Sequence, residues 1–289
     1  MEKLDILCVG GDARMTYTAK ELAKHGCVYT YGTADDGKVT RVLSSPGEMP
    51  VKADMLVLGL IRSDGLDVGS FRNTPINCMD LSPYLKRGAV VIGGKLNIKI
   101  IEYFSSLGFE VRDYLKREEL VLKNTVPTAE GALEIALREL AMTVRDSRCL
   151  ILGSGRVAGA CAELFSAVGA HTDICARNLS ALTSFAIKGH RVFMLGELGE
   201  HIGGYDLIIN TIPAMVLDRE LLCSCDKKGL IIDLASMPGG ADREAAKDLG
   251  VRCIHALGLP GKCAPVTAGR IIADTAIQIL KERRNTDVT

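Results

Sequence analysis

The chain has 289 residues, 47% of them hydrophobic and 24% charged. This composition supports one large or two ordinary folded domains and excludes a disordered chain. Lys and Arg number 35, as do Asp and Glu, and aromatic residues make up only 4%, so neither a general attraction to nucleic acids or anionic lipids nor a base-stacking surface is expected.

The first half of the chain alternates apolar strands with amphipathic helices. We predict strands at residues 4–9, 27–31, 54–60, 89–93 and 109–113, and helices at 16–25 and 97–107. A glycine turn at residues 10–12 follows the first strand, and Lys86-Arg87-Gly88 leads into the fourth.

The second half repeats this order. We predict strands at residues 148–152, 171–176, 206–210, 230–233 and 251–255, and helices at 157–168 and 242–249. A glycine turn again follows the first strand, and Lys227-Lys228-Gly229 leads into the fourth. Strands that alternate with helices and lack polar alternation indicate parallel sheets covered on both faces.

Two further helices join and close the domains. Residues 128–142 predict a long linker helix that starts at Thr128 behind Pro127, and residues 268–282 predict a last helix that packs back across the domain junction. The expected fold class is α/β, with two doubly wound Rossmann-like parallel-sheet domains. Their expected ranges are 1–125 (a Rossmann-like or flavodoxin-like substrate domain), 126–145 (the linker helix), 146–265 (an NAD(P)-binding Rossmann domain) and 266–289 (the C-terminal helix and tail). A ligand is expected in the cleft between the domains.

The glycine turn of the second half carries a dinucleotide fingerprint. Residues 149–159 place Gly153-x-Gly155-x-x-Ala158 between a strand and a helix. Gly153 permits the tight turn, Gly155 lets a pyrophosphate approach the backbone, and Ala158 lets helix and strand pack closely. The coenzyme contacts expected from this turn are Gly153, Ser154, Gly155, Arg156 and Val157.

The next strand end favours NADP over NAD, with NAD as the alternative. An NAD site usually has an acidic residue there, but this chain has Arg177 and Asn178, and Asp173 comes too early. Arg177 can pair with a 2′-phosphate, and Asn178 can add a hydrogen bond.

Other turns at the carboxyl ends of the strands are small, polar or rich in glycine and proline. From these turns we expect cofactor contacts by Asn210, Thr211, Ile212 and Pro213, and substrate contacts by Ser236 and by Thr128 at the linker entry. Glu130 is a candidate general base, or a first-turn carboxylate stabilised by the helix dipole. Lys262 and His255 are further acid–base candidates, although a lone His at a strand end is more often structural.

The first glycine turn, Gly10-Gly11-Asp12-Ala13-Arg14, is not a nucleotide fingerprint. It lacks the third small residue, and Asp12 would repel a phosphate. Gly11 and Arg14 are candidates to hold a substrate anion, and Asp12 is a candidate catalytic carboxylate. The alternative is an ordinary strand–helix turn.

Ten cysteines occur without any CxxC pair, and several lie inside apolar strands. We expect reduced, buried thiols and no metal site, because no third ligand accompanies Cys223 and Cys225. No apolar run reaches the roughly 18 residues of a membrane span, and no secretory signal is evident. We therefore expect a soluble cytoplasmic protein with no membrane or nucleic-acid partner.

A set of motifs, in this order and spacing, resembles the dipicolinate synthase A-subunit family. The motifs are GGDAR, NTVPTAEGA, the GxGxxA turn, INTIPAMVL, LIIDLASMPGG and LGLPGKCAPVTAG, and the resemblance runs from Ile6 to about Leu280. The chain departs from the family at Met237, where a basic side chain is expected. If that side chain holds a substrate carboxylate in relatives, Arg14 and Arg62 are candidates to do so here. His255 also looks atypical for the family.

The resemblance implies a function. Members work in the mother-cell cytoplasm of sporulating bacteria, use NAD(P), and with a flavoprotein-like B subunit oxidise dihydrodipicolinate to dipicolinate (pyridine-2,6-dicarboxylate). The expected partners are this B subunit, the small dicarboxylate substrate and further copies of the chain in a homo-oligomer. Two other functions stay open: an NADP-dependent dehydrogenase of another small carboxylic acid, and a non-catalytic NADP-binding partner or sensor subunit.

Overall fold

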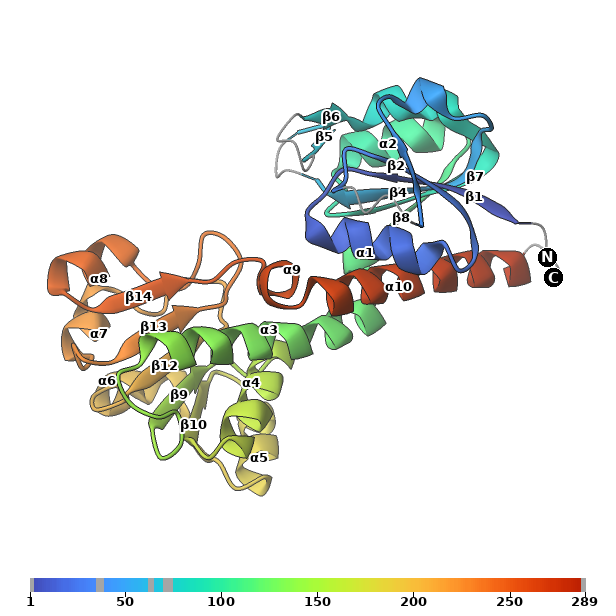
Figure 1. Cartoon of the computed structure of the whole chain (residues 1–289). Coiled ribbons are helices and arrows are strands. Elements are labelled where there is room, and N and C mark those ends of the chain that lie inside the picture. Colours follow the sequence, from blue (N-terminus) through green and yellow to red (C-terminus); the bar gives the residue numbers. More distant parts are fainter. Residues whose placement is uncertain (1–2, 35–38, 62–64, 70–74, 287–289) are drawn as a thin grey trace. The chain divides into compact units, whose positions relative to one another are not determined.

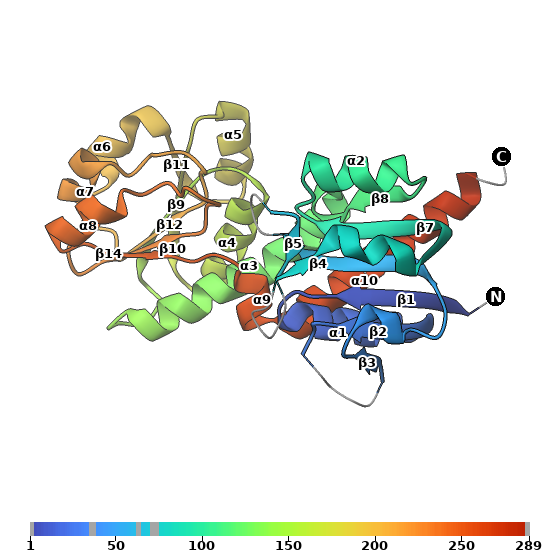
Figure 2. The ribbon, with the colours of Figure 1, turned by 90° about the horizontal axis from the view of Figure 1, so that it is seen from above.

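The computed structural model describes residues 3–34, 39–61, 65–69 and 75–286, which form two compact units (Figures 1 and 2). Unit 1 comprises Met1–Asn124 and Pro260–Thr289, and unit 2 comprises Thr125–Leu259. The chain therefore leaves unit 1, builds unit 2 and returns to unit 1 for its last helix.

Unit 1 is built on a six-stranded parallel sheet of order β3-β2-β1-β4-β7-β8. Its strands are β1 (Leu4–Val9), β2 (Gly26–Tyr31), β3 (Arg41–Leu43), β4 (Ala53–Leu60), β7 (Leu85–Gly94) and β8 (Glu110–Asp113), beside an antiparallel pair of β5 (Asp67–Val68) and β6 (Ile76–Asn77). Its helices are α1 (Ala13–Leu22), α2 (Ile98–Ser106), the start of α3 (Glu118–Glu139), α10 (Pro265–Thr286) and the 3-10 turns η1 (Pro46–Glu48), η2 (Cys78–Tyr84) and η3 (Tyr114–Lys116).

Two layers of helices cover this sheet. Helices α1 and α10 lie side by side on one face, and α2 lies on the other (Figures 1 and 2). Glycine makes the α1–α10 contact close: a Cβ at Gly269 would lie 2.6 Å from the carbonyl oxygen of Arg14, and the hydroxyl of Thr18 donates to the Gly269 carbonyl at 3.1 Å. We predicted that the C-terminal helix packs back across the domain junction; the structure places it in unit 1, where it packs against the first helix of the chain.

Unit 2 has a second six-stranded parallel sheet, of order β11-β10-β9-β12-β13-β14. Its strands are β9 (Arg148–Leu152), β10 (His171–Ala176), β11 (Arg191–Met194), β12 (Leu207–Asn210), β13 (Leu230–Asp233) and β14 (Arg252–His255). Its helices are α4 (Arg156–Ala167), α5 (Leu179–Ile187), η4 (Leu195–Glu197), α6 (Leu198–His201), α7 (Arg219–Ser224), α8 (Arg243–Leu249) and the start of α9 (Leu259–Cys263), with most of α3.

The repeat read from the sequence is confirmed by this topology. In chain order each main sheet has its strands arranged 3-2-1-4-5-6, which is the doubly wound arrangement of dinucleotide-binding domains. In unit 2, one apolar layer joins α3, α4 and α5 to the sheet, and the other joins α6, α7 and α8 to it.

Some helix bounds differ from the predicted ones. Helix α1 begins at Ala13 rather than residue 16, because the Asp12 side chain accepts a hydrogen bond from the Arg14 backbone N–H and caps the helix. The linker helix begins at Glu118, ten residues before the predicted start, and ends at Glu139. Pro127 lies inside this helix and therefore does not mark its start. The helix contributes to both cores, since Leu120 is buried in the core of unit 1 and Ala132 in the core of unit 2.

Six of the ten cysteines are buried. Burial raises the pKa of Cys8 and of Cys161 to about 12, so both stay protonated at neutral pH. Within the described ranges, no helix combines the length and the apolar character needed to span a membrane.

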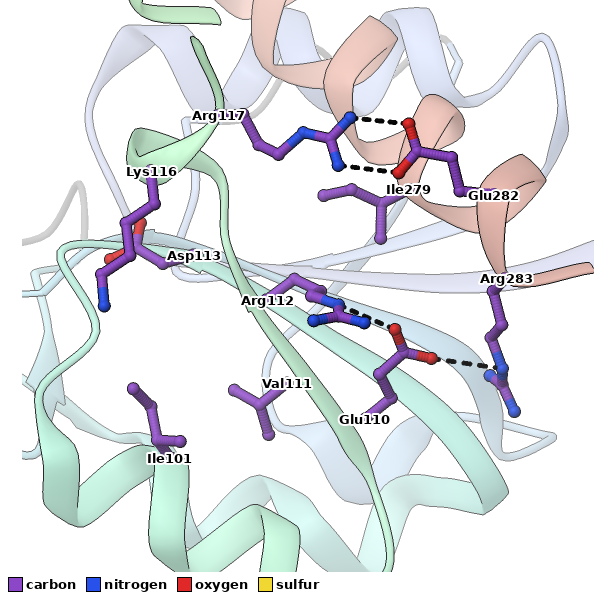
Figure 3. A pocket seen from close by; sticks show the side chains of 10 residues that line it. All are labelled: Ile101, Glu110, Val111, Arg112, Asp113, Lys116, Arg117, Ile279, Glu282 and Arg283. Atoms are coloured by element: carbon purple, nitrogen blue, oxygen red, sulfur yellow. Dashed lines mark hydrogen bonds and ion pairs between the residues drawn. The ribbon is translucent and has the colours of Figure 1, made fainter. Parts of the chain in front are cut away.

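An ion pair of unit 1 gives a pH-dependent prediction. Arg117 donates two hydrogen bonds to the carboxylate of Glu282 on α10, each 2.7 Å long (Figure 3). These bonds from Arg117 lower the pKa of Glu282 from 4.5 to about 2. Because the pKa falls on folding, the pair stabilises unit 1 above about pH 4.5, and this stabilisation is lost as the pH falls toward 2.

We expect Glu282→Gln to lower the free energy of unfolding at pH 7 by less than about 1 kcal/mol, because the pair is partly exposed. Urea unfolding of both proteins between pH 7 and pH 3 tests this: the difference between them should shrink as the pH falls. A difference that stays constant over this range would show that the ionised pair does not carry it.

Candidate functional site

The glycine turn of unit 2 packs tightly against the next strand end. Gly153 follows β9 with a φ of +116°, and a Cβ there would overlap the hydroxyl of Thr211. That hydroxyl and the Thr211 backbone N–H both donate to the carbonyl of Leu152, at 2.8 and 2.9 Å. The predicted cofactor residues Gly153, Thr211 and Ile212 are therefore brought together at the carboxyl edge of the sheet.

The start of α4 at Gly155 is open, whereas Gly153 is closely surrounded by other atoms. Gly155 is the N-cap of α4, is exposed, and a Cβ added to it would meet no atom within 4 Å. The first N–H groups of a helix have no partner within the helix and carry its partial positive charge. Ala158, one turn later, is fully buried against the sheet. The turn thus offers bare backbone donors to a phosphate-bearing group.

Arg177 and Asn178 follow β10 and are exposed. Asn178 is the N-cap of α5, and its side-chain oxygen accepts from the Ala181 N–H at 3.0 Å. Arg177 has no hydrogen bond or ion pair with any described residue, so its guanidinium is available to a ligand. Asp173 accepts a 2.6 Å hydrogen bond from the Tyr205 hydroxyl and is already committed to the fold.

Asn210 lies at the predicted strand end, but its side chain is engaged within the fold. It is fully buried, and its side-chain NH2 group donates to Asp233 at 2.8 Å and to the Ile212 carbonyl at 3.1 Å. Its side-chain oxygen accepts from the Ile212 N–H at 3.1 Å. The side chain is therefore engaged in holding the turn after β12, which presents Thr211 and Ile212, and is not exposed to a ligand.

Asp233 is a central residue that the sequence reasoning missed. It is fully buried at the end of β13 and accepts from the backbone N–H groups of Ala235 and Gly240, at 3.1 and 2.8 Å, as well as from Asn210. The Gly240 carbonyl in turn accepts hydrogen bonds from the backbone N–H groups of Val216 and Leu217, so the network joins the turns after β12 and β13. The position of Asp233 directly after an apolar strand was the available signal.

The turn after β13 presents exposed side chains. Ser236 and Met237 are both exposed, Met237 by 63%. The His255 ring nitrogen Nε2 lies 2.8 Å from the Ala235 carbonyl, which gives this histidine a structural partner. Pro213 after β12 is exposed.

The glycine turn of unit 1 has a different N-cap. The Gly10 N–H donates to the Tyr31 carbonyl at 2.8 Å, and the Gly153 N–H donates to the Cys175 carbonyl at the same distance, so the two turns start alike. Asp12, however, stands at the N-cap of α1, where unit 2 has Gly155. A carboxylate at this position repels a phosphate, so unit 1 does not repeat the open coenzyme turn.

Asp12 forms an ion pair with Arg14. The Arg14 Nε donates to Asp12 at 2.8 Å and Nη2 donates at 2.6 Å, while the Arg14 side chain is only 13% exposed. Burial opposes ionisation of Asp12, but the hydrogen bond and charge of Arg14 outweigh it and lower its pKa. Gly261 leaves room for the pair, because a Cβ there would lie 2.8 Å from the Arg14 Nε.

The remaining predicted residues are placed individually. Gly11 lies in the unit 1 turn, and a Cβ there would overlap Met15. Glu130 is exposed and Thr128 half-buried, both on α3 in unit 2, and Lys262 is exposed on α9. Arg62 lies outside the described residues.

A charged cavity of about 670 Å³ lies beside the edge strand β8 (Figure 3). Its arginines face carboxylates: Arg112 and Arg283 both pair with Glu110, and Arg117 pairs with Glu282. Because these charges neutralise one another, we do not assign this cavity to the substrate.

The chain is similar to known proteins along its whole length. Residues 5–115 match the family model of the N-terminal domain of the dipicolinate synthase A-subunit, and residues 140–242 match the family model "Putative NAD(P)-binding". The chain is 31% identical to the dipicolinate synthase A-subunit of Bacillus subtilis (strain 168), with 96% of each covered.

Two crystal structures agree with this likeness. The A chain of dipicolinate synthase from Bacillus subtilis has a TM-score of 0.86 at 29% identity, with 99% of this chain and 98% of that one covered. The dipicolinate synthase A-subunit of Bacillus halodurans has a TM-score of 0.82 at 28% identity, with 96% of this chain and 98% of that one covered.

Proposed function

Because the chain belongs to the dipicolinate synthase A-subunit family, we propose that it oxidises dihydrodipicolinate to dipicolinate with NAD(P)+ as the oxidant. In this reaction the substrate ring loses a hydride and a proton and becomes aromatic. The bound nicotinamide supplies the hydride acceptor. The residues of the chain have three tasks: to bind the coenzyme, to hold the substrate carboxylates and to accept or pass on the proton.

The open turn at Gly155 is the observation that carries this proposal. Its exposed N-cap and the donor groups at the start of α4 fit a pyrophosphate, which no side chain obstructs. The backbone of Gly153, held against Thr211, keeps the turn in this form. The residues present therefore fit a nicotinamide dinucleotide.

The preferred coenzyme is NADP. Arg177 is exposed just beyond the end of β10, where the adenosine ribose is bound in this fold class. Its guanidinium can form a charge-assisted fork with a 2′-phosphate, which NAD lacks.

We expect Arg177→Ala to weaken NADP+ binding by about 10- to 100-fold, the effect of losing a charge-assisted hydrogen-bond pair. NAD+ binding should change by less than about threefold, since it makes no such pair. Titration of NADP+ and NAD+ against both proteins measures this. Arg191→Ala is a matched control, because Arg191 is exposed at the opposite end of the sheet and should leave both constants unchanged. Equal losses for the two coenzymes would contradict the preference.

Arg14 is proposed to hold a substrate carboxylate in unit 1. The Gly11 N–H, the other predicted donor of this turn, already donates to the Gly69 carbonyl and is not assigned to the substrate. Arg14 is largely buried, which strengthens its attraction for an anion. Both oxygens of Asp12 accept bonds from Arg14, and a carboxylate with a lowered pKa is a weak base. We therefore assign Asp12 the role of orienting Arg14 and keep Glu130 as the candidate proton acceptor. Ser236 and Thr128 are retained as candidate substrate contacts.

The names of the relatives mark them as one component of a synthase with more than one kind of chain. We therefore propose that this chain has a B subunit for its partner, that it forms homo-oligomers, and that it works in the mother-cell cytoplasm of a sporulating bacterium. The tight pairing of Asp12 leaves few free acid–base groups. This observation favours one alternative, a coenzyme-binding component that does no chemistry itself.

A direct assay of NADPH formation separates the proposed synthase activity from the non-catalytic role and from another dehydrogenase activity. The protein, alone and with its B partner, is incubated with dihydrodipicolinate and NADP+, and NADPH formation is followed by its absorbance. We expect NADPH formation with the wild-type protein and none with a variant that no longer binds the coenzyme. Absence of NADPH in both mixtures supports the non-catalytic role, and turnover of another small acid in its place supports a different dehydrogenase.

A further inference from the structure

Tyr114 carries a buried polar group without a partner. The side chain is 1% exposed, and its hydroxyl forms no hydrogen bond with any described residue. A hydroxyl that is removed from water and left unpaired destabilises the folded protein. Such groups are rare in native structures and call for a specific explanation, of which a role in ligand binding is one.

Local structure fixes this tyrosine. Asp113 accepts hydrogen bonds from the backbone N–H groups of Lys95, Leu96 and Leu115, at 3.2, 3.0 and 2.8 Å. These bonds tie the turn after β7 to the start of η3, where Tyr114 lies. The phenol ring lies against Gly94 at the end of β7: a Cβ there would be 2.5 Å from the Tyr114 hydroxyl. The glycine leaves the space that the hydroxyl occupies.

Tyr114 lies near the candidate substrate turn. Its ring packs against Gly94 at the carboxyl end of β7, the Asp12–Arg14 turn follows the carboxyl end of β1 at the same edge of the sheet, and Tyr114 belongs to the same apolar cluster as Met15 of α1. Burial raises the pKa of Tyr114 strongly, the positive charge of Arg14 opposes this, and Asp113 and Asp12 add to it. The phenol therefore stays neutral and can donate its proton in a hydrogen bond. Arg14 is itself only partly used, because its Nε and Nη2 bind Asp12 while Nη1 has no hydrogen bond to the described chain.

We propose that the Tyr114 hydroxyl is a second donor for the substrate carboxylate that Arg14 binds through Nη1 at the start of α1. The inference rests on the proposed function, since it supplies a donor to that same carboxylate. A neutral O–H and a guanidinium N–H can each bind one oxygen of the same anion. The hydroxyl is closed to solvent, so a carboxylate that reaches it is desolvated, which strengthens both bonds. Tyr114 is thus a specificity-determining residue for an anionic substrate.

Tyr114→Phe tests the proposal in the full-length protein. The probe is dipicolinate, titrated calorimetrically in the presence of NADP+ in buffer freed of divalent cations. We expect the variant to bind dipicolinate about 10- to 100-fold more weakly, as the loss of a hydrogen bond to a charged group predicts. The Tm of the free protein should rise, because an unpaired buried hydroxyl is removed. A tyrosine with a merely structural hydrogen bond would give a lower Tm and an unchanged dissociation constant.

Tyr205→Phe is the matched control. Tyr205 is equally buried, but its hydroxyl donates to Asp173 in unit 2 at 2.6 Å. This control should lower the Tm and leave dipicolinate binding unchanged. Gly94→Ala adds a second variant: its Cβ should displace the Tyr114 ring and weaken dipicolinate binding without removing the hydroxyl.

The outcomes separate this inference from the proposed function. If wild type binds dipicolinate and Tyr114→Phe binds it equally well, the role of Tyr114 is overturned and the proposed function is untouched. If wild type binds NADP+ but no dipicolinate, the proposed substrate is wrong, and the role of Tyr114 is overturned with it. Weaker binding in both Tyr114→Phe and Gly94→Ala, with a raised Tm in the former, supports the proposal.

Discussion

Gly155→Val is expected to abolish binding of the nicotinamide coenzyme while leaving unit 2 folded. Gly155 has a φ of −83° and a ψ of −174°, which any residue can adopt, and a Cβ there meets no protein atom within 4 Å. The new side chain would instead occupy the space in front of the N–H groups of α4, where a pyrophosphate must lie. We expect a loss of affinity of roughly 100-fold or more and a Tm within about 2 °C of wild type.

Gly153→Ala is the counterpart, in which the expected effect is a loss of stability. Gly153 has a φ of +116°, and its Cβ would overlap the Thr211 hydroxyl, so the substitution should destabilise unit 2 by about 2–4 kcal/mol. Fluorescence titration with NADPH and thermal unfolding measure both variants. Undiminished coenzyme binding by Gly155→Val would show that the phosphates do not lie at this turn.

Asp233→Ala should cause the largest loss of stability among the substitutions considered. Asp233 is fully buried and accepts from Asn210, Ala235 and Gly240. Alanine would leave the buried N–H groups of Ala235 and Gly240 without an acceptor and would remove one of the two acceptors of the Asn210 NH2 group. Breaking such a network costs about 3–5 kcal/mol. The turns after β12 and β13 should loosen together, so coenzyme binding should weaken as well. Urea unfolding of the full chain measures the loss.

Asp242→Ala is the control for Asp233→Ala. Asp242 is a half-buried N-cap of α8 and accepts one hydrogen bond, from the Ala245 N–H at 2.9 Å. Its loss should cost about 1 kcal/mol, as expected for a single helix cap. Equal losses for the two variants would mean that the buried network at Asp233 contributes no more than an ordinary cap.

The fold could be predicted from the sequence because its signals are local. Apolar strands such as Leu4–Val9 and Arg148–Leu152 end in glycine turns, and their predicted bounds agree with the structure. Two equal series of strands and helices then imply two doubly wound sheets. Helix starts were harder to predict: Pro127 suggested the beginning of a helix that in fact starts at Glu118, since tertiary packing overrides a single local signal.

The site was only partly predictable for a physical reason. The Gly153–Gly155 turn is continuous in sequence, and its geometry follows from its glycines. The contact of Gly261 with Arg14, by contrast, joins residues far apart in the chain. Asn210 illustrates the same limit, since its place after a strand suggested a ligand contact, whereas its side chain is buried against Asp233. Whether a polar side chain faces a ligand or the core depends on partners that local sequence does not name.

The two units share one topology but differ at the cap of their first helix. Each begins with a strand, a glycine turn and a helix, but the N-cap of that helix is Asp12 in unit 1 and Gly155 in unit 2. The Asp12 carboxylate caps its own helix and pairs with Arg14, whereas Gly155 has no side chain that could cap α4. This single difference is the basis for assigning the coenzyme to unit 2 and the substrate anion to unit 1.

A crystal structure of the protein with NADP+ tests this assignment most directly. We predict electron density for the pyrophosphate against the backbone of Gly153–Val157, with the 2′-phosphate beside Arg177. Coenzyme density at the Gly10–Asp12 turn, or an empty turn at Gly155 under saturating NADP+ and NAD+, would contradict it.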